Sequence, residues 1–166
     1  MPKRPAIEDL DIPDSAHNVP KGYPTYATSD AMWNLQLHIY APMIASPRPR
    51  VTMKGTFMPS DYTKHCRALG VSMAYARGII ETKYLGKTWD ASAKMYVDLA
   101  FWAPALIGDL DNMAKTILDA GQLHKGEETG AELWTNDRQI HQLNIAYIAV
   151  DEPMLWQTVI RVKALP

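Results

Sequence analysis

The chain has 166 residues, of which 47% are hydrophobic and 21% charged, with a formal net charge of −1. This composition fits one globular domain and excludes a collagen-like repeat, a coiled coil or a long disordered polymer. No apolar run approaches the roughly 20 residues that cross a bilayer, and the N-terminus lacks an apolar stretch of signal-peptide length. Because Cys66 is the only cysteine and cannot form an internal disulfide, we expect a soluble protein of the reducing cytoplasm.

The N-terminal part, residues 1–32, is expected to be a Pro-rich extension, and residues 33–166 are expected to form the folded domain. Its prolines disfavour helix, and no periodic apolar pattern appears there. Alternating apolar and polar residues over 33–40 predict the first strand. A loop with the sequence SPRPR follows, and Ser60 is the predicted N-cap of a helix that extends to about Ile80.

The second half of the chain contains three more predicted strands and one helix. Alternation predicts a strand over 94–101, and 139–150 and 155–163 read as two further strands. Between them, residues 108–121 carry an apolar stripe at helical spacing, with Asp109 as N-cap and Gly121 closing the helix. The order strand, helix, strand, helix, strand, strand predicts an α+β domain with two helices packed on a small mixed sheet.

Charge is distributed unevenly along the chain. Nine basic and three acidic residues fall between positions 46 and 94, whereas five basic and nine acidic residues fall between 101 and 166. This asymmetry is typical of a polyanion-binding surface beside a cation site, and scattered solvated charges would produce it equally well.

The segment GDLDNMAKTILDAG, residues 108–121, concentrates acids at the start of the second predicted helix. In the structural interpretation, Asp109 caps the helix, Asp111 favours the positive helix end and Lys115 pairs with acidic neighbours. In the functional interpretation, two carboxylates this close together repel each other until a divalent cation such as Mg²⁺ binds them. We expect Asp137, at the turn before the next strand, to fold back to the helix N-terminus as a third ligand, and Asp119 to pair with Lys115.

These blocks resemble the RusA family of Holliday junction resolvases, endonucleases common in phages and prophages. The match is carried by D-L-D-N-x₂-K from Asp109 to Lys115, by L-D-A at 118–120, and by Asp137, Gln139 and Ile140 of the block N-D-x-Q-I. SPRPRVT at 46–52 is similar to a Pro-, Lys- and Arg-rich loop of the family. Asn136 stands where the family often has a further Asp, and the lead-in APALIG lacks the basic residues common in relatives.

The resemblance implies a RusA-like fold and a homodimer in the cytoplasm of a bacterial host. It implies an Mg²⁺-dependent endodeoxyribonuclease, with Mn²⁺ as a substitute ion, that places paired symmetric nicks in four-way junctions during DNA recombination and repair. Asp109, Asp111 and Asp137 would bind the metal, and Lys115 would be the essential lysine of the cluster.

The DNA-binding residues are expected among the basic residues that follow the first strand. The candidates for phosphate contacts are Arg48, Arg50, Lys54, Lys64 and Arg67. Trp102 and Trp134, near the acids, are candidates for stacking on opened bases.

Two other functions fit the same residues. One is a non-catalytic protein of the same fold that binds branched DNA. The other is a metal-dependent transferase that uses D-x-D on a nucleoside diphosphate, although the sequence lacks a Gly-rich phosphate loop.

Overall fold

The computed structural model describes residues 12–42, 46, 50–57, 59–106, 108–122, 131–151 and 156–166, with only the backbone described at 50–52, 56 and 57. Five strands form one mixed sheet in the order β1-β2-β7-β5-β6. The strands are β1 (Thr25–Thr28), β2 (Leu35–Ile39), β5 (Met95–Ala103), β6 (Ile140–Ala149) and β7 (Gln157–Ala164). All neighbouring pairs are antiparallel except β5 and β6, which are parallel.

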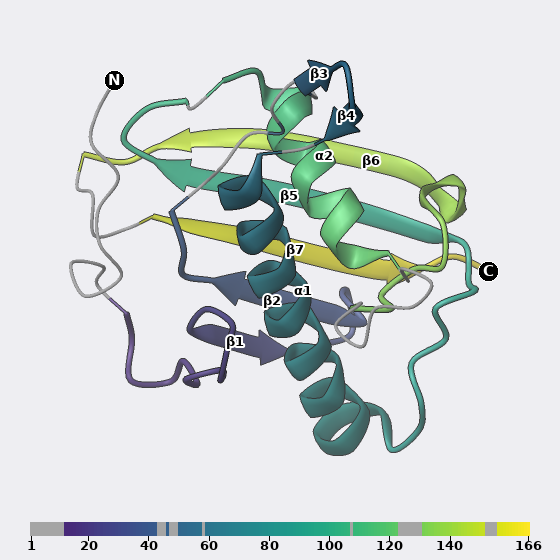
Figure 1. Cartoon of the computed structure of the whole chain (residues 1–166). Helices are drawn as coiled ribbons and strands as arrows, with labels where there is room; N and C mark the ends of the chain where they lie inside the picture. Colours follow the sequence, from purple (N-terminus) through teal and green to yellow (C-terminus); the bar gives the residue numbers. More distant parts are fainter. Residues whose placement is uncertain are drawn as a thin grey trace.

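Two helices, α1 (Ser60–Ile80) and α2 (Leu110–Gly121), cover one face of this sheet (Figure 1). A short π-helical turn, η2 (Glu81–Leu85), extends α1 and ends at Gly86, whose φ of 61° is readily adopted by a residue without Cβ. A second, two-stranded sheet is formed by β3 (Arg50–Thr52) and β4 (Gly55–Phe57). The molecule therefore has two layers, and the prediction of an α+β domain with two main helices on a mixed sheet is confirmed.

The core lies between the helices and the sheet, where the alternating strand residues point. Leu35, Leu37 and Ile39 of β2 are fully buried, as are the odd-numbered residues from Met95 to Ala103 of β5. Thr158, Ile160 and Val162 of β7 are buried on the same side. Period-two alternation in the sequence thus identified the side of each central strand that packs against the helices.

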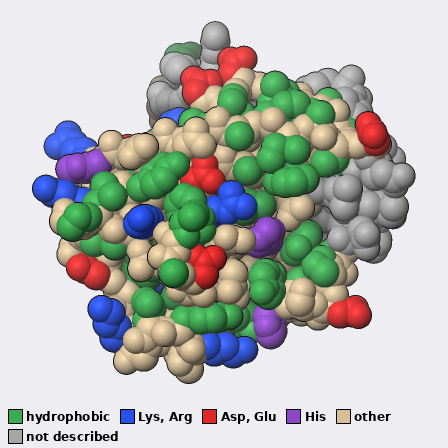
Figure 2. Space-filling model, turned by 180° about the vertical axis from the view of Figure 1, so that it is seen from behind, with side chains coloured by type: hydrophobic (Ala, Val, Ile, Leu, Met, Phe, Trp, Pro, Cys, Tyr) green, Lys and Arg blue, Asp and Glu red, His purple; other side chains and the backbone are tan. Residues whose placement is uncertain are grey.

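No helix of the described residues covers the opposite face of the sheet, and Figure 2 looks onto it. Polar side chains there bond to one another across neighbouring strands. Arg161 Nη1 lies 3.1 Å from Asp98 Oδ2, and Asn144 Nδ2 donates to Asp98 Oδ1 at 2.7 Å. Apolar side chains lie around the charged groups on this face (Figure 2). These bonds satisfy polar groups that the two-layer architecture leaves without a covering element.

Two elements differ from the sequence-based expectation. Residues 25–28, within the predicted extension, form β1 and pair with β2 from Thr25↔Ile39 to Thr28↔Gln36. The segment after the first strand, expected to be a loop, contains the β3–β4 hairpin. These three strands are only three or four residues long, which is too short for alternation to distinguish them from loop.

The start of α1 also differs in detail. The helix begins at Ser60 as predicted, but Pro59 is its N-cap and no side chain caps it. Ser60 is therefore not the N-cap. No helix of the described residues is long and apolar enough to cross a membrane.

Candidate functional site

The first turn of α2 presents two carboxylates to solvent. α2 forms because Met113, Ala114 and Ile117 make one buried stripe, with Leu110 and Leu118 packed beside it. Asp109 is the N-cap by backbone geometry, yet its side chain makes no capping hydrogen bond. Asp109 and Asp111 are both exposed. Neither carboxylate has a side-chain hydrogen bond or ion pair within the described part of the chain, so the capping explanation does not account for Asp109.

Ser46, the first residue of the SPRPR segment, contacts this same turn. The Ser46 amide donates a hydrogen bond to the Asn112 carbonyl oxygen at 3.1 Å, next to Asp111 in the chain. Figure 1 shows the β3–β4 hairpin beside the N-terminal end of α2. The tertiary structure therefore brings Ser46 and the backbone of the β3–β4 hairpin to the helix end that carries the acids.

Lys115 and Asp119 form an ion pair one turn apart on α2. Lys115 Nζ lies 2.9 Å from Asp119 Oδ2 and 3.2 Å from Asp119 Oδ1. This confirms the prediction that Asp119 pairs with Lys115. The Lys115 side chain is 58% exposed, so it can exchange this partner for a phosphate at a small cost.

Asp137 lies in a compact turn that the block N-D-x-Q-I builds. Asn136 is the N-cap of a 3₁₀ turn, η3 (Asp137–Gln139), and its side chain accepts a hydrogen bond from the Arg138 amide at 2.9 Å. The Gln139 side-chain oxygen accepts from the Thr135 and Asn136 amides, both at 2.9 Å. Asn136 is thus a capping residue in this chain, and the turn leaves Asp137 exposed.

Within one chain, the structure does not bring Asp137 to Asp109 and Asp111. Trp134 Nε1 donates to the Leu118 carbonyl oxygen at 3.0 Å, which holds the segment before Asp137 at the C-terminal end of α2. The 12-residue helix is about 18 Å long, and the two aspartates are at its other end. No group of three His, Cys, Asp or Glu residues that could hold a metal is found among the described residues. The expectation that Asp137 folds back to the helix N-terminus is therefore wrong for a single chain.

The predicted phosphate contacts lie on two elements. Lys54 is exposed at the tip of the β3–β4 hairpin, and Lys64 and Arg67 are exposed on α1. Arg50 begins β3, but its side chain is not described, and Arg48 lies outside the described residues. Figure 1 shows the β3–β4 hairpin and α1, which carry Lys54, Lys64 and Arg67, on the helical side of the main sheet.

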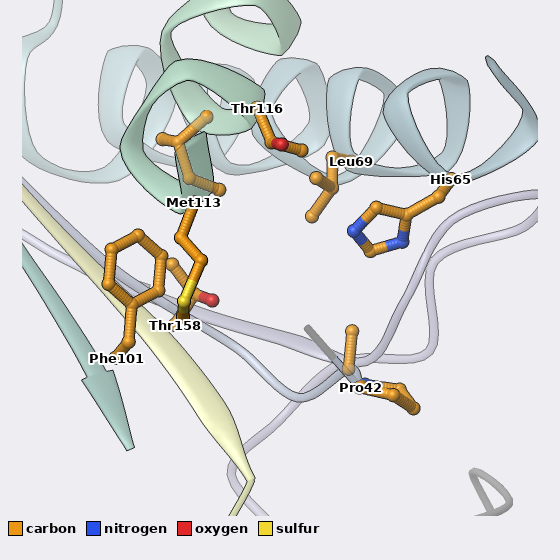
Figure 3. Close-up of a pocket in the computed structure, with 9 residues that line it drawn as sticks. Pro42, His65, Leu69, Phe101, Met113, Thr116 and Thr158 are labelled. Carbon is orange, nitrogen blue, oxygen red and sulfur yellow. The ribbon is translucent and has the colours of Figure 1, made fainter. Parts of the chain in front are cut away.

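A small pocket between α1, α2 and the sheet contains none of the predicted site residues. His65, Met113 and Thr116 are among its lining residues (Figure 3). His65 is 5% exposed, and its Nδ1 lies 2.6 Å from the Tyr23 hydroxyl. The pocket has room for about one water molecule, so a nucleotide does not fit in it. It belongs to the packing between the two layers.

Two potentially reactive side chains near the pocket remain protonated at neutral pH. Burial raises the pKa of Tyr62 to about 12 and raises the pKa of the Cys66 thiol above its usual value. Neither group is thus a ready base or nucleophile, in line with the interpretation of Cys66 as a small packing residue.

Trp134 is fully buried and donates its indole N–H to Leu118, so it cannot stack on a DNA base. Trp102 is on the open face of the sheet, away from α2, because it alternates with the buried Phe101 and Ala103. The interpretation of Trp134 as a stacking residue is wrong, and Trp102 is on the face opposite the acids.

Two residues near the site have structural roles that the sequence analysis did not predict. Gln139 also donates to the carbonyl oxygens of Ala91 and Ala93, at 2.8 and 3.2 Å, and so joins the start of β6 to the segment before β5. Gly121 is the last residue of α2, and a Cβ there would lie within 2.8 Å of three atoms of the Trp134 indole. The sequence analysis named Gln139 only as part of the resemblance and Gly121 only as the end of the helix.

In comparisons with known proteins, no family model and no curated protein matches the chain.

Proposed function

We propose that this protein is a Mg²⁺-dependent, structure-selective endonuclease of the RusA type that nicks branched DNA, with the four-way junction as substrate. The observation that carries the proposal is the contact between Ser46 and Asn112, because it brings the residue that precedes Arg48 and Arg50 in the sequence beside two carboxylates that have no partner among the described residues. A phosphodiester substrate needs both features: cations to hold its backbone and hard oxygen ligands for a metal at the scissile phosphate.

The donor set fits magnesium. Asp109 and Asp111 offer carboxylate oxygens in solvent, and Mg²⁺ in nucleic-acid enzymes typically takes one or two carboxylates, keeps several waters and binds substrate phosphate. When bound, the ion would polarise the scissile phosphate and lower the pKa of a coordinated water.

The residues of the chain itself would bind and orient the DNA. Exposed Lys64 and Arg67 would neutralise phosphates on the helical side of the molecule without reading sequence. Lys115, one turn from Asp111 on the same helix, would leave Asp119 to stabilise negative charge on the reacting phosphate. As the resemblance implies, two copies of the chain would act on the two opposing strands of the junction.

A nicking assay with one substituted acid tests this proposal. On a four-way junction with Mg²⁺, we expect Asp111→Asn to cut at least about 100-fold more slowly than the unsubstituted chain while still binding the junction, because a metal ligand is lost. The matched control is Asp61→Asn, since Asp61 is likewise an exposed acid in the first turn of a helix. Linear duplex of the same sequence and a reaction with EDTA complete the experiment.

The outcomes separate the proposal from its closest rival. Full cutting by Asp111→Asn, or no cutting of any branched DNA by the unsubstituted chain, would contradict the nuclease assignment. Tight junction binding without cutting would favour a non-catalytic junction-binding protein. The separation of Asp137 from Asp109 and Asp111 within one chain is the observation that supports this alternative.

A further inference from the structure

The β3–β4 hairpin is a two-stranded ribbon separate from the main sheet. Within the described residues its strands pair only with each other, and Thr52 is opposite Gly55. Met53 and Lys54 are therefore the two residues of the connecting turn. Gly55 has a φ of 123°, which a residue with a Cβ rarely adopts, so the chain reverses here and leaves Met53 and Lys54 at the tip of the ribbon.

Met53 is fully exposed at this tip. It is the most exposed large apolar residue in the described part of the chain, followed by Met32 at 64%. Two-residue hairpin turns usually contain Asn, Asp or Gly, whose backbone preferences suit the turn. A methionine offers the turn no such advantage, and at full exposure it adds nothing to the core. A binding partner that buried this side chain would gain the free energy of removing its apolar surface from water.

The charges around the tip favour a polyanion as this partner. Lys54 is exposed next to Met53, and Figure 1 shows the hairpin beside the N-terminal end of α2, where the two exposed carboxylates are. Residues 46–60 contain no acidic residue and three basic ones, Arg48, Arg50 and Lys54. DNA offers both partners that such a tip needs, because phosphates attract the cations and the base stack can accept an apolar side chain.

We propose that Met53 inserts between bases at the branch point of the DNA substrate and so makes binding selective for branched over linear DNA. Lys54 would contact a flanking phosphate and hold the tip against the DNA. Methionine is among the apolar side chains that act as wedges in DNA-bending proteins. This inference rests on the proposed function, because it takes branched DNA as the substrate.

The selectivity follows from the cost of opening the base stack. In a linear duplex, insertion separates two stacked base pairs, and this cost offsets much of the gain from burying one apolar side chain. At a branch point the stack is already interrupted, so opening it costs less while the gain from burial stays the same. Phosphate contacts alone would not give this preference, because branched and linear DNA carry the same backbone charge.

The first test compares the affinities for a four-way junction and for a linear duplex of the same sequence, in EDTA so that no DNA is cut. Met53→Ala should bind the junction about tenfold more weakly than the unsubstituted chain, because it loses the burial of one apolar side chain. Its affinity for the linear duplex should be unchanged, and Met53→Leu should restore junction binding. Met32→Ala is the matched control at an exposed methionine between β1 and β2, and it should change neither affinity.

Met53→Lys separates insertion from charge. An added cation strengthens phosphate contacts with any DNA, so a tip that acts by charge alone would bind both DNAs more tightly and keep its preference for the junction. The proposal predicts that Met53→Lys loses this preference. Because the Met53 side chain is fully exposed, each of these variants should keep the Tm of the unsubstituted chain, and a change in affinity will not report unfolding.

The second test observes the base stack directly. A fluorescent adenine analogue, whose emission rises when it is unstacked, is placed either at the branch point or in the middle of an arm. At saturating protein, the unsubstituted chain and Met32→Ala should raise the emission at the branch point only, whereas Met53→Ala should not raise it. Equal emission with Met53→Ala and the unsubstituted chain would overturn the proposal.

The outcomes distinguish this inference from the proposed function. Met53-dependent unstacking by a protein that does not nick DNA with Mg²⁺ would support the wedge and contradict the nuclease assignment. Unchanged junction preference in Met53→Ala, together with normal nicking, would overturn the wedge and leave the nuclease assignment intact. A chain that binds neither DNA, with or without Mg²⁺, would overturn both. Met53-dependent binding to vesicles of anionic lipid without DNA binding would likewise overturn the proposal, because it would assign the tip to a membrane surface.

Discussion

At the scale of single residues, His38 makes the stability of the protein depend on pH. Its Nδ1 lies 3.0 Å from Gln157 Oε1 and its Nε2 lies 3.1 Å from Gln36 Nε2. Burial lowers the pKa of His38 below the usual 6.5. The unfolded chain therefore binds a proton more readily than the folded one, and stability falls as the pH drops below about 6.5.

We expect His38→Gln to reduce this loss of stability on acidification. Urea unfolding at pH 7.5 and pH 5.5 measures the difference in the free energy of unfolding for each variant. The exposed His141 provides the control, and His141→Gln should keep the pH dependence of the unsubstituted chain. Equal pH dependence in His38→Gln and the unsubstituted chain would show that another group is responsible.

Gly121 is required by packing. We expect Gly121→Ala to lower the free energy of unfolding by about 1–3 kcal/mol, because the added Cβ would overlap the buried Trp134 indole and force the ring to shift. Gly78→Ala is the matched control on α1, where a Cβ meets nothing within 4 Å. That change should stabilise the protein by up to about 1 kcal/mol through helix propensity. Similar values for the two variants in thermal or urea unfolding would contradict this explanation.

At the scale of elements, Gln139 holds the start of β6 to the segment before β5. Gln139→Ala removes the hydrogen bonds to both Ala91 and Ala93 and leaves the Thr135 and Asn136 amides without their acceptor. We expect a loss of about 1–3 kcal/mol in the free energy of unfolding.

Hydrogen exchange locates the effect of Gln139→Ala. Amide protection should fall over 91–95 and 135–140 and stay unchanged in α1. Gln142→Ala, at an exposed position of β6, should change neither stability nor exchange appreciably. If the exchange pattern of Gln139→Ala were unchanged, Gln139 would not be the residue that holds the start of β6 to the segment before β5.

Helix α2 shows what local sequence predicts well and what it does not. Its extent and buried stripe followed from spacing, because a helix of this length must bury one face. The role of the Asp109 side chain could not be predicted from spacing, since the carboxylate of an N-cap residue can accept a hydrogen bond from a backbone amide of the first turn or make no such bond. The Lys115–Asp119 pair was predictable because residues four apart on a helix are neighbours.

At the scale of the whole molecule, the proposed DNA-binding surface predicts a salt dependence. Substituting Lys64 and Arg67 together by Ala should weaken junction binding and reduce the slope of log K against log salt by about 0.9 for each lost phosphate contact. Lys163→Ala, at an exposed residue near the end of β7, should leave the slope unchanged. Fluorescence anisotropy between low and moderate salt measures both. An unaltered slope in the double variant would show that residues other than Lys64 and Arg67 contact the DNA phosphates.

The sequence by itself determined the α+β class, the four longer strands, both helices and the inward face of each central strand. These features depend on periodicity within a single segment, and burying an amphipathic segment leaves little choice of side. Only the tertiary structure decided that β7 lies between β2 and β5, that β6 is an edge, and that Ser46 meets Asn112. It also decided that Asp137 and Asp109 lie at opposite ends of α2. Because β5 and β6 are parallel, the chain returns to the end of the sheet where β5 begins before the turn that contains Asp137. Pairings between segments far apart in sequence leave no periodic signal in either one.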